Sequence, residues 1–322
     1  MTQLAQEGRM SRIVIGSDSY YRTLDALQRN PVNSLAFGGG TNSLGVLIGL
    51  KELGLQRWIN LITFSDTKGE KPETYDAVDR ADAWVRDNGF RCGGIVTLRT
   101  ISPDRGFEGL EGMAVRLGTL PSKAFGYKSC SQRFKIEPQQ KFMNHWELSQ
   151  RAWKNGKKVT QIIGYDAGEP QRAKTYTNDK YDFFYPLIEW GWGRDECVDA
   201  IQREGLPLPG KSACFFCPSM RKPEVIRLSK EHPELFDRAV AMERGALSSG
   251  KLGVVKGLGR HWSWEELVKA SEPQRSLFPE NSMGIDCACF DGEPDEDDAA
   301  IEARYAEYRR LSQEDDEIDN GK

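Results

Sequence analysis

The stretch NSLAFGGGTNSLGVLIGLKEL, residues 33–53, decides the fold of this chain. Its first five residues predict a strand, and residues 44–53 predict an apolar helix that ends before Gly54. Glycines let a backbone approach a phosphate closely, and the free amides at a helix start attract its negative charge. A glycine turn that only caps a helix is the alternative. The stretch predicts a phosphate loop made by Gly38, Gly39, Gly40, Thr41, Asn42 and Ser43.

The segments after this stretch continue the alternation of strand and helix. Residues 58–64 and 94–98 predict strands with a helix over residues 73–88 between them, and residues 158–164 predict a later strand. This order favours a parallel sheet with right-handed crossovers, flanked by helices. We therefore expect an α/β, Rossmann-like fold, followed by a smaller helical region that contains cysteines.

Residues 37–43, FGGGTNS, resemble the PP-loop Ser-Gly-Gly-x-Asp-Ser of the phosphoadenosine phosphosulfate (PAPS) reductase and N-type ATP pyrophosphatase family. Gly38 stands at the position of the first serine and Asn42 at that of the aspartate. Further segments resemble family motifs in the family's order: FSDTKG with PETY over residues 64–75, CSQRFKIEP over residues 130–138 and GYDAGEPQR over residues 164–172. The four motifs together span about half of the chain.

The resemblance implies an adenine nucleotide alpha-hydrolase-like fold that binds ATP or a related adenine nucleotide, with Mg²⁺ as a further candidate cofactor. It implies catalytic roles for Asp66 and Arg172, and nucleotide contacts from Thr67, Gly164 and Glu169. Asp66 follows a strand, where open α/β sheets bind ligands, and an arginine fork suits phosphate or sulfate oxygens. A surface salt bridge with Glu169 is the alternative for Arg172.

Composition divides the chain into four expected parts. They are an N-terminal extension over residues 1–30, a PP-loop nucleotide-binding domain over residues 31–185, a helical cysteine-containing region over residues 186–270 and an acidic, partly disordered tail over residues 271–322. The tail holds 16 acidic and five basic residues, so the formal net charge of −4 conceals a net positive body. A positive body suits an anionic ligand, and a solvated surface with an acidic tail is the alternative.

The chain has no stretch that predicts a signal peptide or a membrane span, because its start is polar and its apolar runs are short. We expect a cytoplasmic protein without a membrane partner. The seven cysteines are then expected to be reduced, which points to metal ligation or redox chemistry rather than disulfides.

The sharpest cysteine pattern is Cys214-Phe-Phe-Cys217-Pro. Such a pair fits a redox dithiol, half of a zinc site or half of an iron–sulfur site. The region also resembles a PAPS-reductase-like branch of phages and mobile elements, and the sulfur-transfer proteins of DNA phosphorothioation. That resemblance implies a 4Fe–4S cluster on Cys130, Cys197, Cys214 and Cys217. A zinc site and unligated cysteines are the alternatives, and we expect the pair Cys287 and Cys289 to be incidental.

Three functions fit these patterns. The first is ATP-dependent sulfur transfer, with adenylation of an acceptor, release of pyrophosphate and help from the cluster. The second is reduction of a sulfonucleotide, although the family's C-terminal Glu-Cys-Gly-x-His motif is absent here. The third is a non-catalytic nucleotide-binding subunit of a DNA modification or defence complex. The expected partners are an adenine nucleotide, a nucleic-acid or small-molecule sulfur acceptor, and a protein that donates sulfur or electrons.

Overall fold

A computed structural model describes residues 13–102, 106–126, 129–173 and 178–271. The first 12 residues of the predicted N-terminal extension and nearly all of the acidic tail lie outside these residues, as do Cys287 and Cys289. The described residues belong to one compact unit. The four predicted domain boundaries stay predictions.

The core of the fold is a five-stranded sheet in the order β3-β2-β1-β6-β7, in which every neighbouring pair is parallel. The strands are β1 (Val32–Phe37), β2 (Leu61–Asp66), β3 (Val96–Arg99), β6 (Val159–Ile163) and β7 (Tyr181–Phe184). A short antiparallel pair, β4 (Ile101–Ser102) and β5 (Phe107–Glu108), follows β3. The sheet confirms the predicted α/β class.

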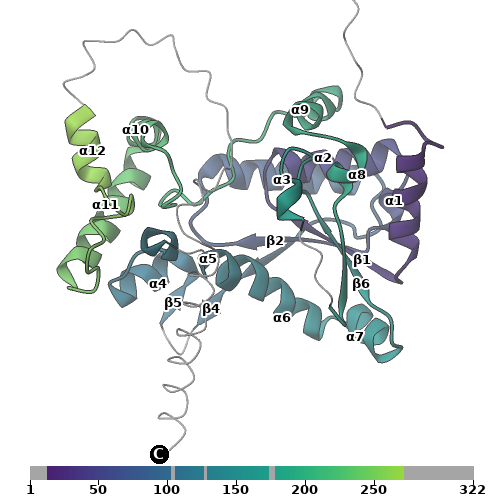
Figure 1. The fold of residues 1–322 in the computed structure, drawn as a ribbon, viewed down its shortest axis with the longest axis horizontal. Helices are drawn as coiled ribbons and strands as arrows, with labels where there is room; N and C mark the ends of the chain where they lie inside the picture. The colour runs from purple at the N-terminus through teal and green to yellow at the C-terminus, as the bar shows by residue number, and fades with distance from the viewer. Residues whose placement is uncertain (1–12, 103–105, 127–128, 174–177, 272–322) are drawn as a thin grey trace, which may run out of the picture. The chain divides into compact units, whose positions relative to one another are not determined.

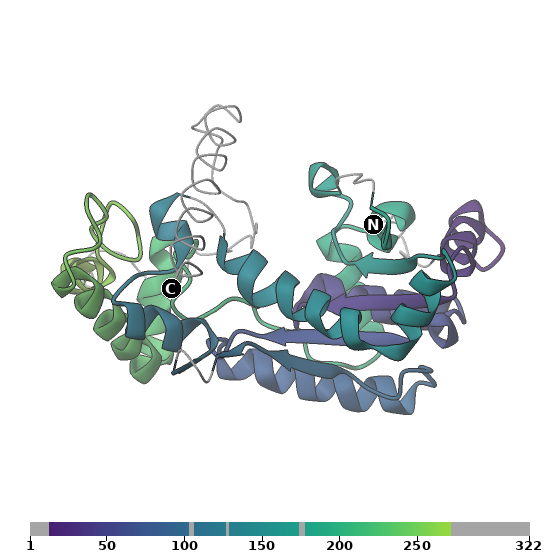
Figure 2. The same ribbon diagram turned by 90° about the horizontal axis from the view of Figure 1, so that it is seen from below.

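Helices cover both faces of the sheet (Figure 1), and Figure 2 shows the same layers from below. Helices α2, α3, α8 and α9 share one core with the sheet, and α6 and α7 contact its strands from the other face. Their bounds are α1 (Asp18–Gln28), α2 (Thr41–Glu52), α3 (Pro72–Asp87), α6 (Glu137–His145), α7 (Glu147–Lys154), α8 (Pro186–Trp190) and α9 (Arg194–Arg203).

The remaining helices form a second core with the cysteine-containing turn at residues 214–217. They are α4 (Gly109–Leu117), α5 (Ser129–Ser131), α10 (Lys222–Glu231), α11 (Pro233–Ser248) and α12 (Trp264–Ser271). Short helical turns complete the described chain: η1 (Gln56–Trp58), η3 (Ser122–Phe125), η5 (Pro170–Arg172) and the π-helical segment η4 (Gln132–Ile136). No helix among the described residues is both long enough and apolar enough to cross a membrane.

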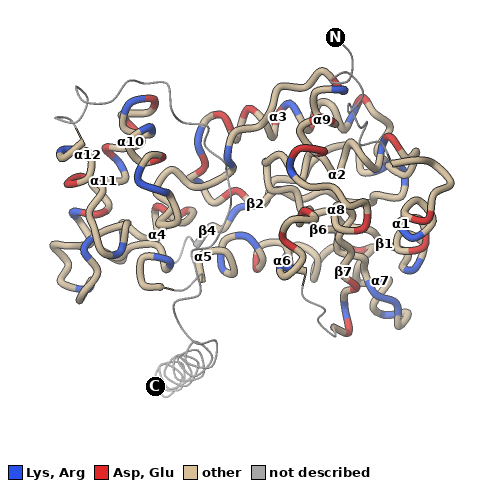
Figure 3. The backbone as a smooth tube through the Cα atoms, turned by 45° about the horizontal axis from the view of Figure 1, so that its top comes forward, with Lys and Arg blue, Asp and Glu red and all other residues tan. Residues whose placement is uncertain are grey.

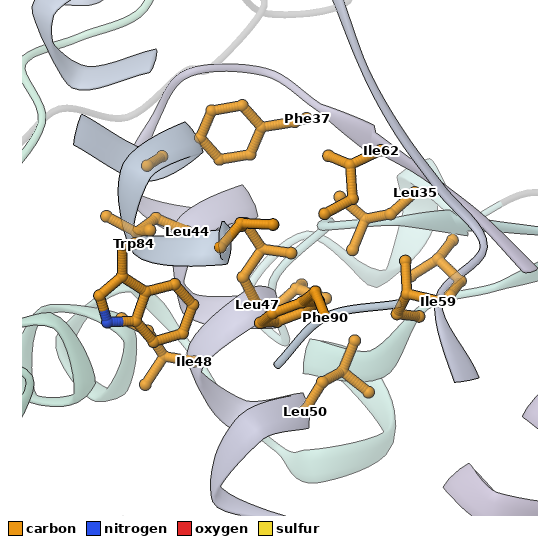
Figure 4. Close-up of a cluster of buried hydrophobic side chains, with 14 of the residues drawn as sticks. Leu35, Phe37, Leu44, Leu47, Ile48, Leu50, Ile59, Ile62, Trp84 and Phe90 are labelled. Atoms are coloured by element: carbon orange, nitrogen blue, oxygen red, sulfur yellow. The ribbon is translucent and has the colours of Figure 1, made fainter. Parts of the chain in front are cut away.

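Helix α2 is the centre of the main core, and nine of its 12 residues are buried. Leu47 and Ile48 are fully buried, and Figure 4 shows them among side chains from β1, β2 and α3. A helix that is apolar on all sides needs cover on all sides. The sheet covers one side of α2, and α9 makes extensive contact with another.

Two glycines let other helices approach α2. A Cβ at Gly45 would lie 2.7 Å from Cys197 Sγ of α9, and a Cβ at Gly49 would lie 2.3 Å from Trp190 Cζ3 of α8. Both separations are far shorter than carbon atoms tolerate. The two glycines of α2 are therefore the places where α8 and α9 contact it, and the Cys197 side chain packs against Gly45.

We predict that Gly49→Ala destabilises the protein by about 1–3 kcal/mol, because the new methyl group overlaps the Trp190 ring. The free energy of unfolding in urea measures the change. Gly245→Ala in α11 is the matched control, since its Cβ would meet nothing within 4 Å. We expect the control to be neutral or slightly stabilising, as alanine favours a helix over glycine. Equal losses in both variants would contradict the packing role of Gly49.

Candidate nucleotide site

The predicted phosphate loop lies at the carboxyl end of the central strand, β1. The chain leaves β1 through α2 to reach β2 on one side, and β6 pairs with β1 on the other side. The order of strands therefore reverses at β1. In open α/β sheets, ligands bind in the crevice outside the carboxyl ends of the strands at such a switch point. The topology therefore puts residues 38–43 where a ligand is expected.

The loop has the backbone of an anion site. Gly39 has a φ of +74°, and a Cβ there would lie 3.1 Å from Thr74 and 3.3 Å from Val78. No side chain caps the start of α2, whose first bond runs from the Leu44 amide to the Gly40 carbonyl at 3.2 Å. The first amides of the helix, together with its dipole, are thus available to an anion.

Ser43 braces the loop from within. Its Oγ accepts a hydrogen bond from the Gly38 amide at 3.2 Å and donates one to the Gly40 carbonyl at 3.0 Å. A hydroxyl has a single proton. In this arrangement, the hydroxyl proton of Ser43 holds the glycine turn and is not offered to a phosphate.

Ser212 supports the same loop from outside, a contact that no sequence pattern predicted. Its hydroxyl donates to the Gly38 carbonyl, and its Cβ would lie 3.5 Å from a Cβ at Gly40. The carbonyl and the following amide of a trans peptide point in opposite directions. By holding the Gly38 carbonyl, Ser212 directs the Gly39 amide away from itself, toward the opposite side of the turn.

Asn42 and Gly164 join the start of α2 to the end of β6. A Cβ at Gly164 would lie 3.2 Å from the Ser43 Cα and 3.3 Å from the Asn42 carbonyl oxygen, so glycine permits a close approach. Asn42 Nδ2 donates to Asp166 Oδ2 at 2.7 Å, and the other oxygen of Asp166 accepts from the Gly168 amide at 2.9 Å. A carboxylate thus lies beside the loop, on residue 166 rather than on residue 42.

Asp66, a predicted catalytic residue, is 1% exposed and fully occupied. One oxygen accepts from the Lys68 amide and from the Tyr75 hydroxyl, each at 2.8 Å, and the other accepts from Arg99 Nε at 3.0 Å. Burial, together with the hydrogen bond to Asp66 and its charge, raises the pKa of Tyr75. In this structure Asp66 orients Arg99, another residue that the sequence did not single out.

Arg172 and Glu169 form the salt bridge that was the alternative for them, with Nη1 to Oε2 at 2.6 Å. The guanidinium also lies 4.3 Å from the centre of the Tyr165 ring, a cation–π geometry. Tyr165 in turn stacks on Tyr185 with ring planes 10° apart. The pair and its aromatic support follow β6, at the same edge of the sheet as the loop.

Thr67 contacts the thiol region rather than the phosphate loop. Its hydroxyl lies 3.1 Å from Cys214 Sγ and 3.3 Å from Glu70 Oε1. Lys135 Nζ is 3.6 Å from the same Glu70 oxygen, while Glu70 Oε2 is buried and has no partner in the described part of the chain. Burial alone lowers the pKa of Lys135, but Glu70 and the nearby thiols outweigh it and raise the pKa overall.

The structure brings three of the four predicted metal ligands into one region. Cys130, Cys214 and Cys217 pack in the helical core, and Cys197 packs against α2 in the other core. Burial raises the pKa of Cys214 well above its ordinary value and, to a smaller extent, that of Cys217. Burial also raises the pKa of Cys197 to about 12.

The predicted four-cysteine set is therefore not assembled, because the Cys197 side chain fills the space over Gly45. Within the part of the chain that the structure describes, no three His, Cys, Asp or Glu side chains are placed to hold a metal ion. As they stand, the residues do not fit a 4Fe–4S cluster or a zinc ion bound by four thiolates.

Comparisons with known proteins add little to this picture. No family model and no curated protein matches the chain. Among solved structures, a similar chain is the phosphoadenylyl-sulfate (PAPS) reductase from Candida auris in a phosphate complex, at 18% sequence identity. The match covers 65% of this chain and 91% of that chain with a TM-score of 0.38. A score that low carries no argument, so the fold class rests on the observed strand order.

We predict that Asn42→Asp, which introduces the PP-loop aspartate, destabilises the protein by about 1 kcal/mol or more, because two carboxylates then face each other. Asp166→Asn in the same chain exchanges the two groups and should restore the stability. Urea unfolding of both single variants and the double variant measures the coupling between the sites. Additive effects in the double variant would show that the two side chains do not interact.

We predict that any iron or zinc in anaerobically purified protein depends on Cys214 and is unaffected by Cys197→Ala, since Cys197 is committed to the contact with Gly45. Elemental analysis of wild type, Cys214→Ala and Cys197→Ala makes the comparison. Loss of metal in both variants would mean that α9 leaves its packing on α2 to supply a fourth ligand.

Proposed function

We propose that the chain is a nucleotide-binding enzyme that carries out ATP-dependent sulfur transfer. The observation that carries this proposal is the phosphate loop with an uncapped helix start, at the switch point between β1 and β6. Such a site binds anions through backbone amides. The resemblance to the PP-loop family supplies the adenine nucleotide and the reaction class.

In the first step, an oxygen of the acceptor forms a bond to the α-phosphorus of ATP. The bond between that phosphorus and the bridging oxygen breaks, and pyrophosphate leaves with the electron pair. The amides of residues 39–43 would hold the departing phosphates and stabilise their charge. Ser43 and Ser212 keep those amides in place, so little reorganisation accompanies the reaction.

Arg172 is a candidate to neutralise the reacting phosphates, and it is held by Glu169 and Tyr165 after β6. Arg99, fixed by buried Asp66, lies further along the sheet at the end of β3. A phosphate offers an arginine fork better geometry than a single carboxylate oxygen does. Asp66 itself serves as a positioning residue, because hydrogen bonds already occupy both of its oxygens.

In the second step, a sulfur atom carried as a persulfide on Cys214 attacks the adenylated carbon of the acceptor, and AMP leaves with the electrons of the carbon–oxygen bond. Cys217 then attacks the new disulfide, which releases the thiolated product and leaves a bond between Cys214 and Cys217. An external sulfur donor and an electron donor restore the persulfide. Cys214 suits this role because it follows Ser212 by two residues and contacts Thr67 after β2.

No step of this scheme passes through a metal. A 4Fe–4S cluster stays a prediction of the sequence. Of its four predicted ligands, Cys130, Cys214 and Cys217 lie in the same core. Lys135 and Glu70 lie beside them and would set the charge around any such centre.

We predict that Gly38→Asp abolishes ATP binding and ATP–pyrophosphate exchange while it leaves the fold intact. Gly38 is exposed, and the nearest atom to a Cβ there is Ser43 Oγ at 3.8 Å, so the side chain fits. The added charge repels phosphate. Calorimetric titration with ATP and thermal unfolding separate binding from stability.

Gly38→Asn is the matched control, because it has the same shape without the charge, and it should retain most of the binding. Binding that survives in Gly38→Asp would place the nucleotide elsewhere. Sulfite release from a sulfonucleotide would favour the reductase alternative, and ATP binding without pyrophosphate exchange would favour a non-catalytic subunit.

A further inference from the structure

Basic and acidic residues interleave along most of the described helices (Figure 3). A cavity of about 160 Å³ at the carboxyl end of β3 departs from this mixture. Its charged lining consists of Arg99, Arg133 and Lys141 against the single carboxylate of Glu137. Arg99 comes from β3, while the others come from η4 and α6, so three segments build the cavity.

One residue of the cavity lining, Thr100, carries an unpartnered hydroxyl. Thr100 Oγ1 is buried and, among the described residues, has no hydrogen-bond partner. A buried polar atom without a partner carries the cost of desolvation and gains nothing in return. The hydroxyl therefore lacks an acceptor that a bound molecule could supply.

The cations of the cavity are only partly neutralised from within. Arg99 uses Nε to bind Asp66, and Arg133 lies 5.9 Å from the centre of the Phe134 ring. Among the described residues, neither Arg133 nor Lys141 forms an ion pair. Three cations and a hydroxyl donor together favour an acceptor that is negatively charged and carries several oxygens.

We propose that this cavity is a subsite for an oxyanion, a phosphate or sulfate group, that is separate from the phosphate loop. Two strand spacings separate β3 from β1, which places the two sites about 10 Å apart along one edge of the sheet. The inference rests on the proposed function and deepens it, because the substrate beside the nucleotide then carries its own anionic group. A phosphorylated small molecule and a nucleic-acid backbone share this chemistry.

The test titrates inorganic phosphate, by calorimetry, into wild-type protein whose loop is saturated with ATP. We expect Lys141→Gln to raise the Kd for this phosphate about fivefold or more. Lys154→Gln, an exposed lysine on α7, is the matched control and should leave the Kd unchanged. Phosphate binding that is absent from wild type, or equal in wild type and Lys141→Gln, would overturn the subsite.

Thr100→Val gives a signature that a purely structural role cannot produce. Replacing an unsatisfied hydroxyl by a methyl group should raise the melting temperature of the ligand-free protein and weaken phosphate binding at the same time. A lower melting temperature would mean that the hydroxyl is already satisfied, and the proposal would fail.

Gly38→Asp separates this inference from the proposed function. It should lose ATP binding at the loop and keep phosphate binding in the cavity, since Gly38 does not line it. If wild type binds phosphate in the cavity but no ATP, the proposed function fails and the subsite stands. Displacement of phosphate by glycerol phosphate or by a single-stranded DNA oligonucleotide then identifies the source of the anion. Displacement by neither would overturn the assignment to a substrate.

Discussion

The burial of α2 is the constraint on which the rest of this structure depends. An apolar helix in the centre of the core must begin somewhere, and this one begins at three glycines at the carboxyl end of β1. Its dipole and unbonded amides point out of the core at that place. The sheet covers one side of the helix, and α9 and α8 pack against it at Gly45 and Gly49. The packing that holds the helix in the core therefore also holds its first amides in place at the loop.

The loop is completed by segments that are distant in sequence. Ser212 bonds to Gly38 from a stretch more than 170 residues away, and Asp166 bonds to Asn42 from the end of β6. The PP-loop motif has a carboxylate at the position of Asn42, and here Asp166 supplies one at its side. The Asp166 carboxylate puts a negative charge near the loop, and its hydrogen bond with Asn42 joins the start of α2 to the segment after β6.

Local physics explains which features the sequence could predict. The strand, the glycines and α2 follow from apolar pattern and backbone freedom within about 20 residues, and the structure confirms them. Helices α6 and α7 are separated at Trp146, whose extended backbone no pattern signals. Cys197 and Ser212 depend on which helix packs on α2 and where the return loop crosses. Cysteine spacing says nothing about the helix that packs on α2 or about the path of the return loop. The resemblance therefore included Cys197 among the ligands, and the contact of Ser212 was missed.

At this edge of the sheet, some buried polar groups have hydrogen-bond partners within the described part of the chain and others have none. Both oxygens of Asp66 accept hydrogen bonds, and one of these bonds holds Arg99 in place. Glu70 Oε2 and Thr100 Oγ1 lie just beyond the same strand ends, buried and without partners among the described residues. A buried polar atom without a partner carries the cost of desolvation. An apolar residue would avoid that cost, and this contrast at Thr100 is the reason for proposing that a bound molecule completes the cavity.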